Sequence, residues 1–110
     1  MIDWERMKEL YDEIGEESFG DVVDLFVEEV AEGVSKLSAA DSARQRVQAF
    51  HFLKGAALNL GLTEMANICA IGEQRDGAGQ DTKDLVAQVT ATFPVLTTSL
   101  VQNWRKHIAA

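Results

Sequence analysis

Cysteine is almost absent from this sequence: Cys69 is the only one in 110 residues. One cysteine can form no internal disulfide, and no cluster of metal-ligating residues accompanies it, so neither a disulfide scaffold nor a cysteine-bound metal is indicated. We expect Cys69 to fill space in the core as a small apolar side chain. A free thiol of this kind suits a reducing compartment.

Basic residues are scarce as well. The chain has 10 Lys and Arg against 18 Asp and Glu, a formal net charge of −8, which argues against non-specific binding to nucleic acid or to an anionic membrane surface. Residues 1–32 carry twelve acids and two bases, whereas residues 42–63 contain no acid. We interpret the acidic end as a solvated helix surface and the acid-free segment as one that would welcome a phosphate or a carboxylate.

The sequence also lacks a long, purely apolar run. Its longest uncharged stretch, residues 85–104, includes Pro94 and several hydroxyl and amide side chains, so we expect a core helix there and no membrane span. The acidic N-terminus has no basic segment followed by an apolar one and is therefore no secretory signal. Together these features predict a cytoplasmic protein.

Apolar residues recur with helical spacing along the whole chain, and turn signals divide it into five segments. A short first helix is expected from about residue 3 to residue 14. Four longer amphipathic helices are expected at roughly 18–37, 42–60, 63–76 and 81–108. None can bury its apolar stripe alone, so the pattern predicts an all-α fold, an antiparallel four-helix bundle (up-down-up-down) with a short N-terminal helix covering one end. The length suits one domain, residues 1–110, and we expect a free-standing monomer.

His51 stands on the polar side of the predicted helix at residues 42–60. Each residue of a helix turns about 100°, and the apolar stripe lies within roughly 60° of the direction opposite His51. The stripe consists of Ala49, Leu53, Ala56, Ala57 and Leu60. His51 is therefore expected to point to solvent. An idle surface histidine is the alternative, and His107, in a polar last turn, is an example of one.

Three neighbours of His51 favour a functional role. Gly55 lies one turn on, where glycine costs a helix about 1 kcal/mol relative to alanine, and close approach by another molecule would offset this cost. Lys54 lies three residues on, where its ammonium can reach an anion held on the ring. Gln48 flanks the ring on the other side and is a candidate to support the ring or the anion.

Apolar residues border this group on the same face. Val47 and Leu58 are expected to be exposed beside His51, and apolar surface around a polar reactive group is typical of a docking patch. With Gly55 and the nearby Arg44 they make up the predicted partner-docking residues. Scattered apolar residues are common on protein surfaces, which is the alternative reading of Val47 and Leu58.

The run AFHFLKGAALNLG closely resembles the signature of the histidine-containing phosphotransfer (HPt) domains of phosphorelays, H-x-L-K-G followed by small residues and a glycine six residues further on. The matching residues are His51, Leu53, Lys54, Gly55, Ala56, Ala57 and Gly61. The resemblance extends to the preceding acidic helix with DLFVEEV, to the following helix with NICAIGE, and to the long last helix. It implies a helical bundle that carries a phosphoryl group on His51, with Lys54 steadying the phosphate and Gly55 leaving room for the partner.

Glu73 can be placed near His51 by counting along the chain. If the chain turns at residues 61–62, a residue ten before the turn lies near one ten to twelve after it. In the family a polar residue at this position, often glutamine, hydrogen-bonds the ring, which implies that Glu73 holds the Nδ1 proton and leaves Nε2 as nucleophile. A glutamate that faces solvent without contacting His51 is the alternative.

Motifs that bind ATP phosphates are missing, and no carboxylates are clustered convincingly for a metal ion. We therefore expect no metal site, no bound cofactor and no autonomous kinase activity, with the Mg²⁺ of phosphoryl transfer held by the partner. The predicted function is that of a phosphorelay intermediate, in which His51 accepts a phosphoryl group from a receiver-domain aspartate and transfers it to another. The expected partners are receiver domains of response regulators and of a hybrid histidine kinase.

Two other classes of function stay open. The chain could be a four-helix interaction module that binds receiver or kinase domains without being phosphorylated. It could also be an enzyme that uses His51 as general base, although no serine, cysteine or metal partner stands at a compatible spacing.

Overall fold

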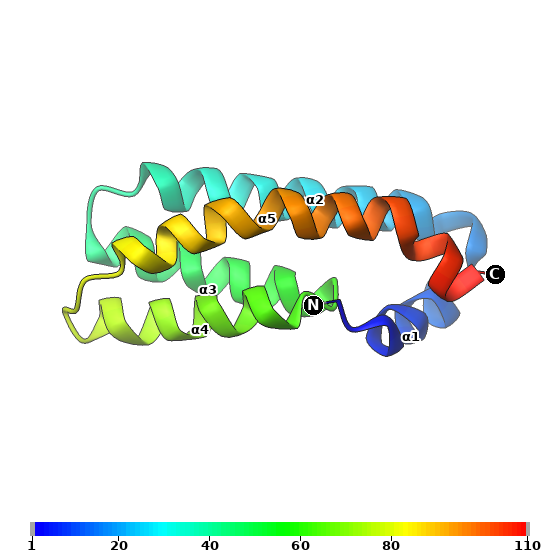
Figure 1. Cartoon of the computed structure of the whole chain (residues 1–110), viewed down its shortest axis with the longest axis horizontal. Coiled ribbons are helices and arrows are strands. Elements are labelled where there is room, and N and C mark those ends of the chain that lie inside the picture. Colours follow the sequence, from blue (N-terminus) through cyan, green and yellow to red (C-terminus); the bar gives the residue numbers. More distant parts are fainter. Residues whose placement is uncertain (1, 110) are drawn as a thin grey trace.

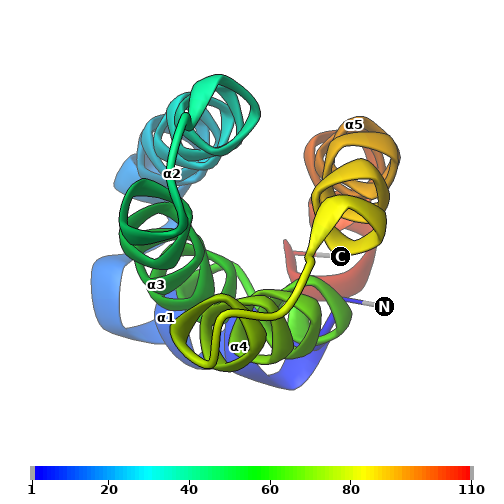
Figure 2. The same ribbon diagram turned by 90° about the vertical axis from the view of Figure 1, so that its left-hand side faces the viewer.

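Four long helices and one short one make up the part of the chain that is described, residues 2–109 of a computed structural model. The elements are α1 (Trp4–Ile14), α2 (Glu16–Ala39), α3 (Ala43–Asn59), α4 (Thr63–Gly77), α5 (Lys83–Trp104) and a final π-helical turn (Arg105–Ala109). Successive long helices run in opposite directions (Figure 1). Both α2 and α4 pack against α3 and α5, which closes the bundle seen end-on in Figure 2. The predicted all-α, up-down-up-down four-helix bundle is confirmed.

Side-chain caps set the starts of two helices. The Asp3 carboxylate accepts the backbone N–H of Arg6 at 3.1 Å at the start of α1, and the Ser42 hydroxyl accepts that of Gln45 at 3.2 Å at the start of α3. Gly15, with φ of 95°, ends α1 and lets α2 begin at the very next residue. As a result α2 begins before the predicted residue 18, and it also continues beyond the predicted residue 37. The last regular helix, α5, ends at residue 104 instead of 108.

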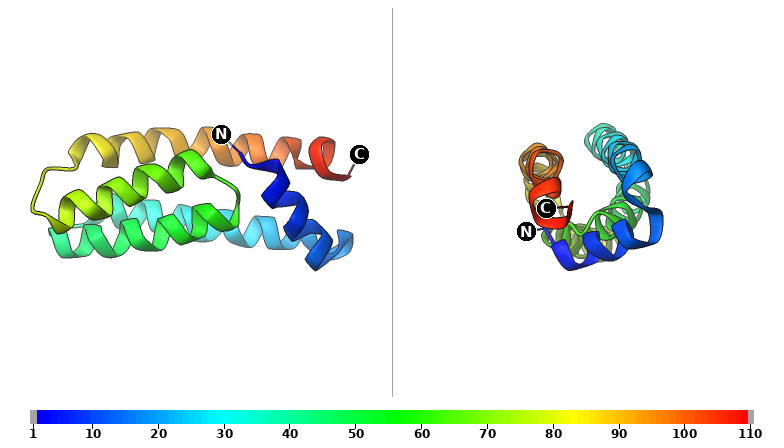
Figure 3. Two further views of the ribbon diagram at one scale, coloured as in Figure 1. Left: turned by 90° about the horizontal axis from the view of Figure 1, so that it is seen from below. Right: turned by 90° about the vertical axis from the view of Figure 1, so that its right-hand side faces the viewer.

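The N-terminal segment crosses the turn between α3 and α4. The backbone N–H of Asp3 donates to the carbonyl oxygen of Gly61 at 2.6 Å. Gly61 has φ of 67°, and a Cβ atom there would lie 2.7 Å from the Asp3 carbonyl oxygen, so only glycine fits this crossing. As a result α1 lies beyond the turn that joins α3 to α4 and covers that end of the bundle (Figure 3).

The last helix was expected to be too polar for a membrane span, and by length and composition this is wrong: Lys83–Ile108 reaches a mean hydropathy of 1.2 over an 18-residue window. In the fold, however, α5 contributes its inner face to the bundle core. The buried side chains of this face and of the following turn are Leu85, Val89, Thr97, Leu100, Trp104 and Ile108. The Trp104 ring packs edge-on against Phe19 of α2, with 4.9 Å between ring centroids.

Candidate functional site

His51 lies near the middle of α3 with its ring in solvent, and 69% of its side-chain surface is exposed. On the opposite side of the helix, the whole predicted stripe is buried: Ala49, Leu53, Ala56, Ala57 and Leu60. The outward direction of His51, inferred from helical geometry, is therefore confirmed. The exposed ring is open to approach by another molecule.

Glu73 of α4 joins His51 to Lys54. Its Oε1 atom lies 3.0 Å from Nδ1 of His51, and its Oε2 atom accepts a hydrogen bond of 2.8 Å from Nζ of Lys54. The position of Glu73 beside the ring, obtained by counting from the turn, is thus correct. The Lys54 ammonium was expected to be available to an anion on the ring, whereas here it is paired with a carboxylate.

The charge state of Glu73 follows from these contacts. The hydrogen bond from Lys54 is the main cause that lowers the pKa of Glu73 below its ordinary value of 4.5, and the contact with His51 acts in the same direction, while partial burial opposes both. Glu73 is therefore ionised at neutral pH. An ionised carboxylate can only accept hydrogen bonds, so Nδ1 of His51 must be the donor in this contact. In the neutral imidazole this leaves the lone pair on Nε2.

A partly buried ion pair holds the end of α4 against α3 close to this site. Asp76, one turn after Glu73, has a side chain only 1% exposed. Its Oδ1 atom accepts a 3.0 Å hydrogen bond from Nε of Arg46, and its Oδ2 atom accepts one of 2.7 Å from the Thr82 hydroxyl before α5. Because both carboxylate oxygens are satisfied, the buried charge is compensated. The pair fixes the position of α4 along α3 below His51.

Gly55 is exposed, and the space around it is open. A Cβ atom added to Gly55 would meet no atom of another side chain or helix within 4 Å in the described part of the chain. Gly55 is thus not needed for packing within the bundle. An alanine-sized side chain would also leave the His51 ring untouched, so any crowding of the ring requires a longer side chain.

The remaining predicted site residues, all on α3, differ in how far they are exposed. Leu58, Arg44 and Gln48 are exposed on α3, whereas Val47 is half-buried. The Nδ1–H group of the ring donates to Glu73 on α4 and makes no hydrogen bond with Gln48, which lies on α3 with His51. These four residues therefore supply surface near His51 and are not part of its hydrogen-bonded group.

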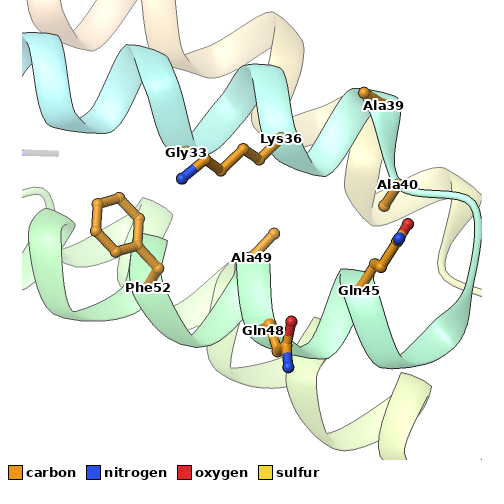
Figure 4. Close-up of a pocket in the computed structure, with 8 residues that line it drawn as sticks. All are labelled: Gly33, Lys36, Ala39, Ala40, Gln45, Gln48, Ala49 and Phe52. Carbon is orange, nitrogen blue, oxygen red and sulfur yellow. The ribbon is translucent and has the colours of Figure 1, made fainter.

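Phe52 is an exposed aromatic residue that the sequence analysis did not single out. It is 44% exposed and lies beside a groove of about 410 Å³ between α2 and α3 (Figure 4). The groove is lined by Gly33, Lys36, Ala39, Ala40, Gln45, Gln48, Ala49 and Phe52. Phe50 and Phe52 stand about 100° to either side of His51 on the helix, so helical spacing alone could not tell which of the two is buried.

Cys69 and His107, the other two residues of chemical interest, contribute to packing. Cys69 is buried, and burial raises the pKa of its thiol to about 12, as expected for a core filler. The His107 ring stacks on Trp4 at 4.1 Å between centroids and 7° between planes, so it fastens α1 to the C-terminal turn. Within residues 2–109, no three His, Cys, Asp or Glu side chains are grouped to hold a metal ion.

Comparison with known families places this geometry in context. A family model described as "Hpt domain" matches residues 21–105, more than three quarters of the chain. The matched range contains α3 and α4 entirely, and with them His51, Lys54 and Glu73. No match was found among curated proteins or among solved structures.

Proposed function

Because the chain belongs to the Hpt domain family, whose members serve histidine phosphotransfer in phosphorelays and interact with receiver domains, we propose that His51 is its phosphoacceptor. The observation that carries this proposal is the contact of the exposed His51 ring with an ionised carboxylate through Nδ1. That contact selects Nε2 as the nucleophile. It also directs the nucleophile away from the bundle.

The proposed step is an in-line displacement at phosphorus. The Nε2 lone pair of His51 attacks the phosphoryl group of a receiver aspartyl phosphate, a P–N bond forms, and the P–O bond to the aspartate breaks with its electron pair leaving on the carboxylate. Nδ1 keeps its proton, so the phosphorylated ring carries a positive charge facing Glu73. Transfer to a second receiver reverses these events at another aspartate.

Lys54 supplies positive charge to the same site. Its ammonium has three donors, of which Glu73 accepts one. A phosphoryl group on the ring adds negative charge within reach of the flexible side chain, and Lys54 can then bond both groups or move to the phosphoryl oxygens. We propose that it stabilises the phosphohistidine without being essential for the attack itself.

The receiver is proposed to dock over the exposed face of α3. Gly55 leaves open space beside His51, and Leu58 and Phe52 offer exposed apolar surface on either side of it. Arg44, Gln48 and Val47 extend this surface toward the start of α3. The receiver brings its own Mg²⁺ and the machinery around its aspartate. We propose that this chain is a monomeric carrier of the phosphoryl group and that it works in the cytoplasm.

Incubation with a receiver domain that carries a labelled aspartyl phosphate tests the proposal. We expect label to appear on this chain in an acid-labile, base-stable linkage, as a phosphoramidate requires. Addition of a second, unphosphorylated receiver should then remove the label. Binding of the receiver without transfer of label would instead favour the interaction module, and no receiver should be phosphorylated by this chain and ATP alone.

A further inference from the structure

The ring of Phe50 points directly at the backbone of Gly72, across the contact between α3 and α4. A Cβ atom added to Gly72 would lie 2.5, 2.6 and 2.7 Å from three atoms at the tip of this ring. Phe50 is fully buried. Glycine is less favourable than alanine in a helix interior, and the space taken by the ring explains why glycine stands at position 72.

This contact is one residue away from the functional one on both helices. Phe50 directly precedes His51 on α3, and Gly72 directly precedes Glu73 on α4. The first pair meets in the core and the second meets at the surface. The distance at which the two helices pack under the ring tip therefore also determines whether the carboxylate of Glu73 reaches Nδ1.

The shift that a Cβ atom on residue 72 would require is larger than the shift that breaks the His51–Glu73 hydrogen bond. Moving a Cβ at position 72 from 2.5 Å to an ordinary contact of 3.4–4 Å from the ring requires a separation of roughly 1 Å. The ring cannot easily take up this shift, since it is enclosed in a close-packed core. The His51–Glu73 distance is 3.0 Å, and a separation beyond about 3.5 Å abolishes such a hydrogen bond.

We propose that Gly72 is a positioning residue for His51: by admitting the Phe50 ring, it sets the spacing of α3 and α4 at which Glu73 holds the Nδ1 proton. The inference rests on the proposed function for its importance in phosphotransfer. Its structural part, control of the His51 tautomer by Gly72, can be measured without any transfer reaction.

A second glycine provides a matched control on the other side of α3. A Cβ atom on Gly33 of α2 would lie 2.6 and 2.9 Å from two atoms of Leu53 and 3.0 Å from Phe52. Gly33→Ala should therefore overpack the core to a similar degree as Gly72→Ala. It strains the contact of α3 with α2, however, and leaves the contact with α4 that carries Glu73.

The test is the protonation of the two ring nitrogens of His51, read from long-range ¹H–¹⁵N spectra at a pH where the ring is neutral. In the unmodified protein we expect the proton on Nδ1. Gly72→Ala should shift the population toward the Nε2–H form that free histidine prefers, and should slow phosphotransfer about 10- to 100-fold. Gly33→Ala should leave the Nδ1–H form dominant even if it lowers the melting temperature as much.

The double variant Phe50→Leu with Gly72→Ala completes the experiment, because the shorter side chain makes room for the added methyl group. It should fold, return the proton to Nδ1 and recover most of the transfer rate, and it decides the question if Gly72→Ala alone does not fold. An unchanged tautomer in Gly72→Ala, an equal change in Gly33→Ala, or a folded double variant without the Nδ1 proton would each overturn the inference. If the tautomer responds as expected but the unmodified protein accepts no phosphoryl group, the proposed function fails and the positioning role stands.

Discussion

Nδ1 of His51 and Oε1 of Glu73 lie 3.0 Å apart across the contact between α3 and α4. The second oxygen of the same carboxylate accepts the Lys54 ammonium at 2.8 Å. One carboxylate thus fixes the tautomer of the exposed histidine and pairs with the cation three residues further along α3. Each of these three side chains affects a different measurable property.

Lys54→Ala should slow phosphotransfer or shorten the lifetime of the phosphohistidine by about tenfold, equivalent to roughly 1.4 kcal/mol, without abolishing acceptance. The same variant should raise the pKa of Glu73 toward its ordinary value, since the Lys54 hydrogen bond is the main cause that lowers it. Transfer kinetics and a carboxylate titration by NMR measure the two effects. Lys8→Ala, which removes an exposed lysine of α1 that pairs with Asp12, is the control. Unchanged kinetics and an unchanged titration would remove Lys54 from the site.

Glu73→Gln should change how stability depends on pH. The folded-state pKa of Glu73 lies below its ordinary value of 4.5, so the ionised form stabilises the folded state above that pH, and this contribution is lost as the pH falls through the folded pKa. The difference in free energy of unfolding between the unmodified protein and the variant should therefore be largest near neutral pH and shrink in acid. Denaturant melts over a pH series measure this difference. Glu13→Gln, at an exposed position on α1, is the control for loss of one charge. A difference that is the same at all pH values would contradict the assigned contacts.

Helical periodicity was sufficient to predict the bundle, the buried stripe of α3 and the outward direction of His51, because a regular helix fixes all three. The short turn at Gly61 was sufficient to place Glu73, since residues at similar distances before and after a turn lie side by side on two antiparallel helices. The pairing of Lys54 with Glu73 depends on two flexible side chains and could not be read in this way. Phe50 and Phe52 are equivalent by spacing, and only the neighbouring helices distinguish the buried ring from the exposed one.

Glycine shows the same limit in another form. The cost of glycine in a helix interior singled out Gly55, yet it applies equally to Gly33 and Gly72. The space around each residue separates them: it is open at Gly55 and filled by side chains at the other two. Such space depends on which helices are neighbours, and sequence periodicity does not report it at the level of single atoms.

Gly55→Ala should raise the free energy of unfolding by up to about 1 kcal/mol, because the added methyl group meets open space in a helix interior. Gly55→Gln should also keep the fold, but its longer side chain should obstruct the receiver and cut phosphotransfer severely. Thermal melts and one transfer assay measure both effects. Ala91→Gln adds the same side chain to an exposed position on α5, and should leave transfer unchanged. A clear fall in melting temperature for Gly55→Gln together with normal transfer would rule out the docking role of Gly55.

Labelled transfer to His51→Gln and to His107→Gln, compared side by side, tests whether His51 carries the phosphoryl group. Both variants should give nearly unchanged circular dichroism in the helical region. The His51 side chain is 69% exposed, and the loss of the His107–Trp4 stack affects the attachment of α1 to the C-terminal turn and not the four bundle helices. We expect transfer from a phosphorylated receiver to be abolished in His51→Gln and retained in His107→Gln. Label that persists in His51→Gln, or that is lost in His107→Gln, would contradict the assignment.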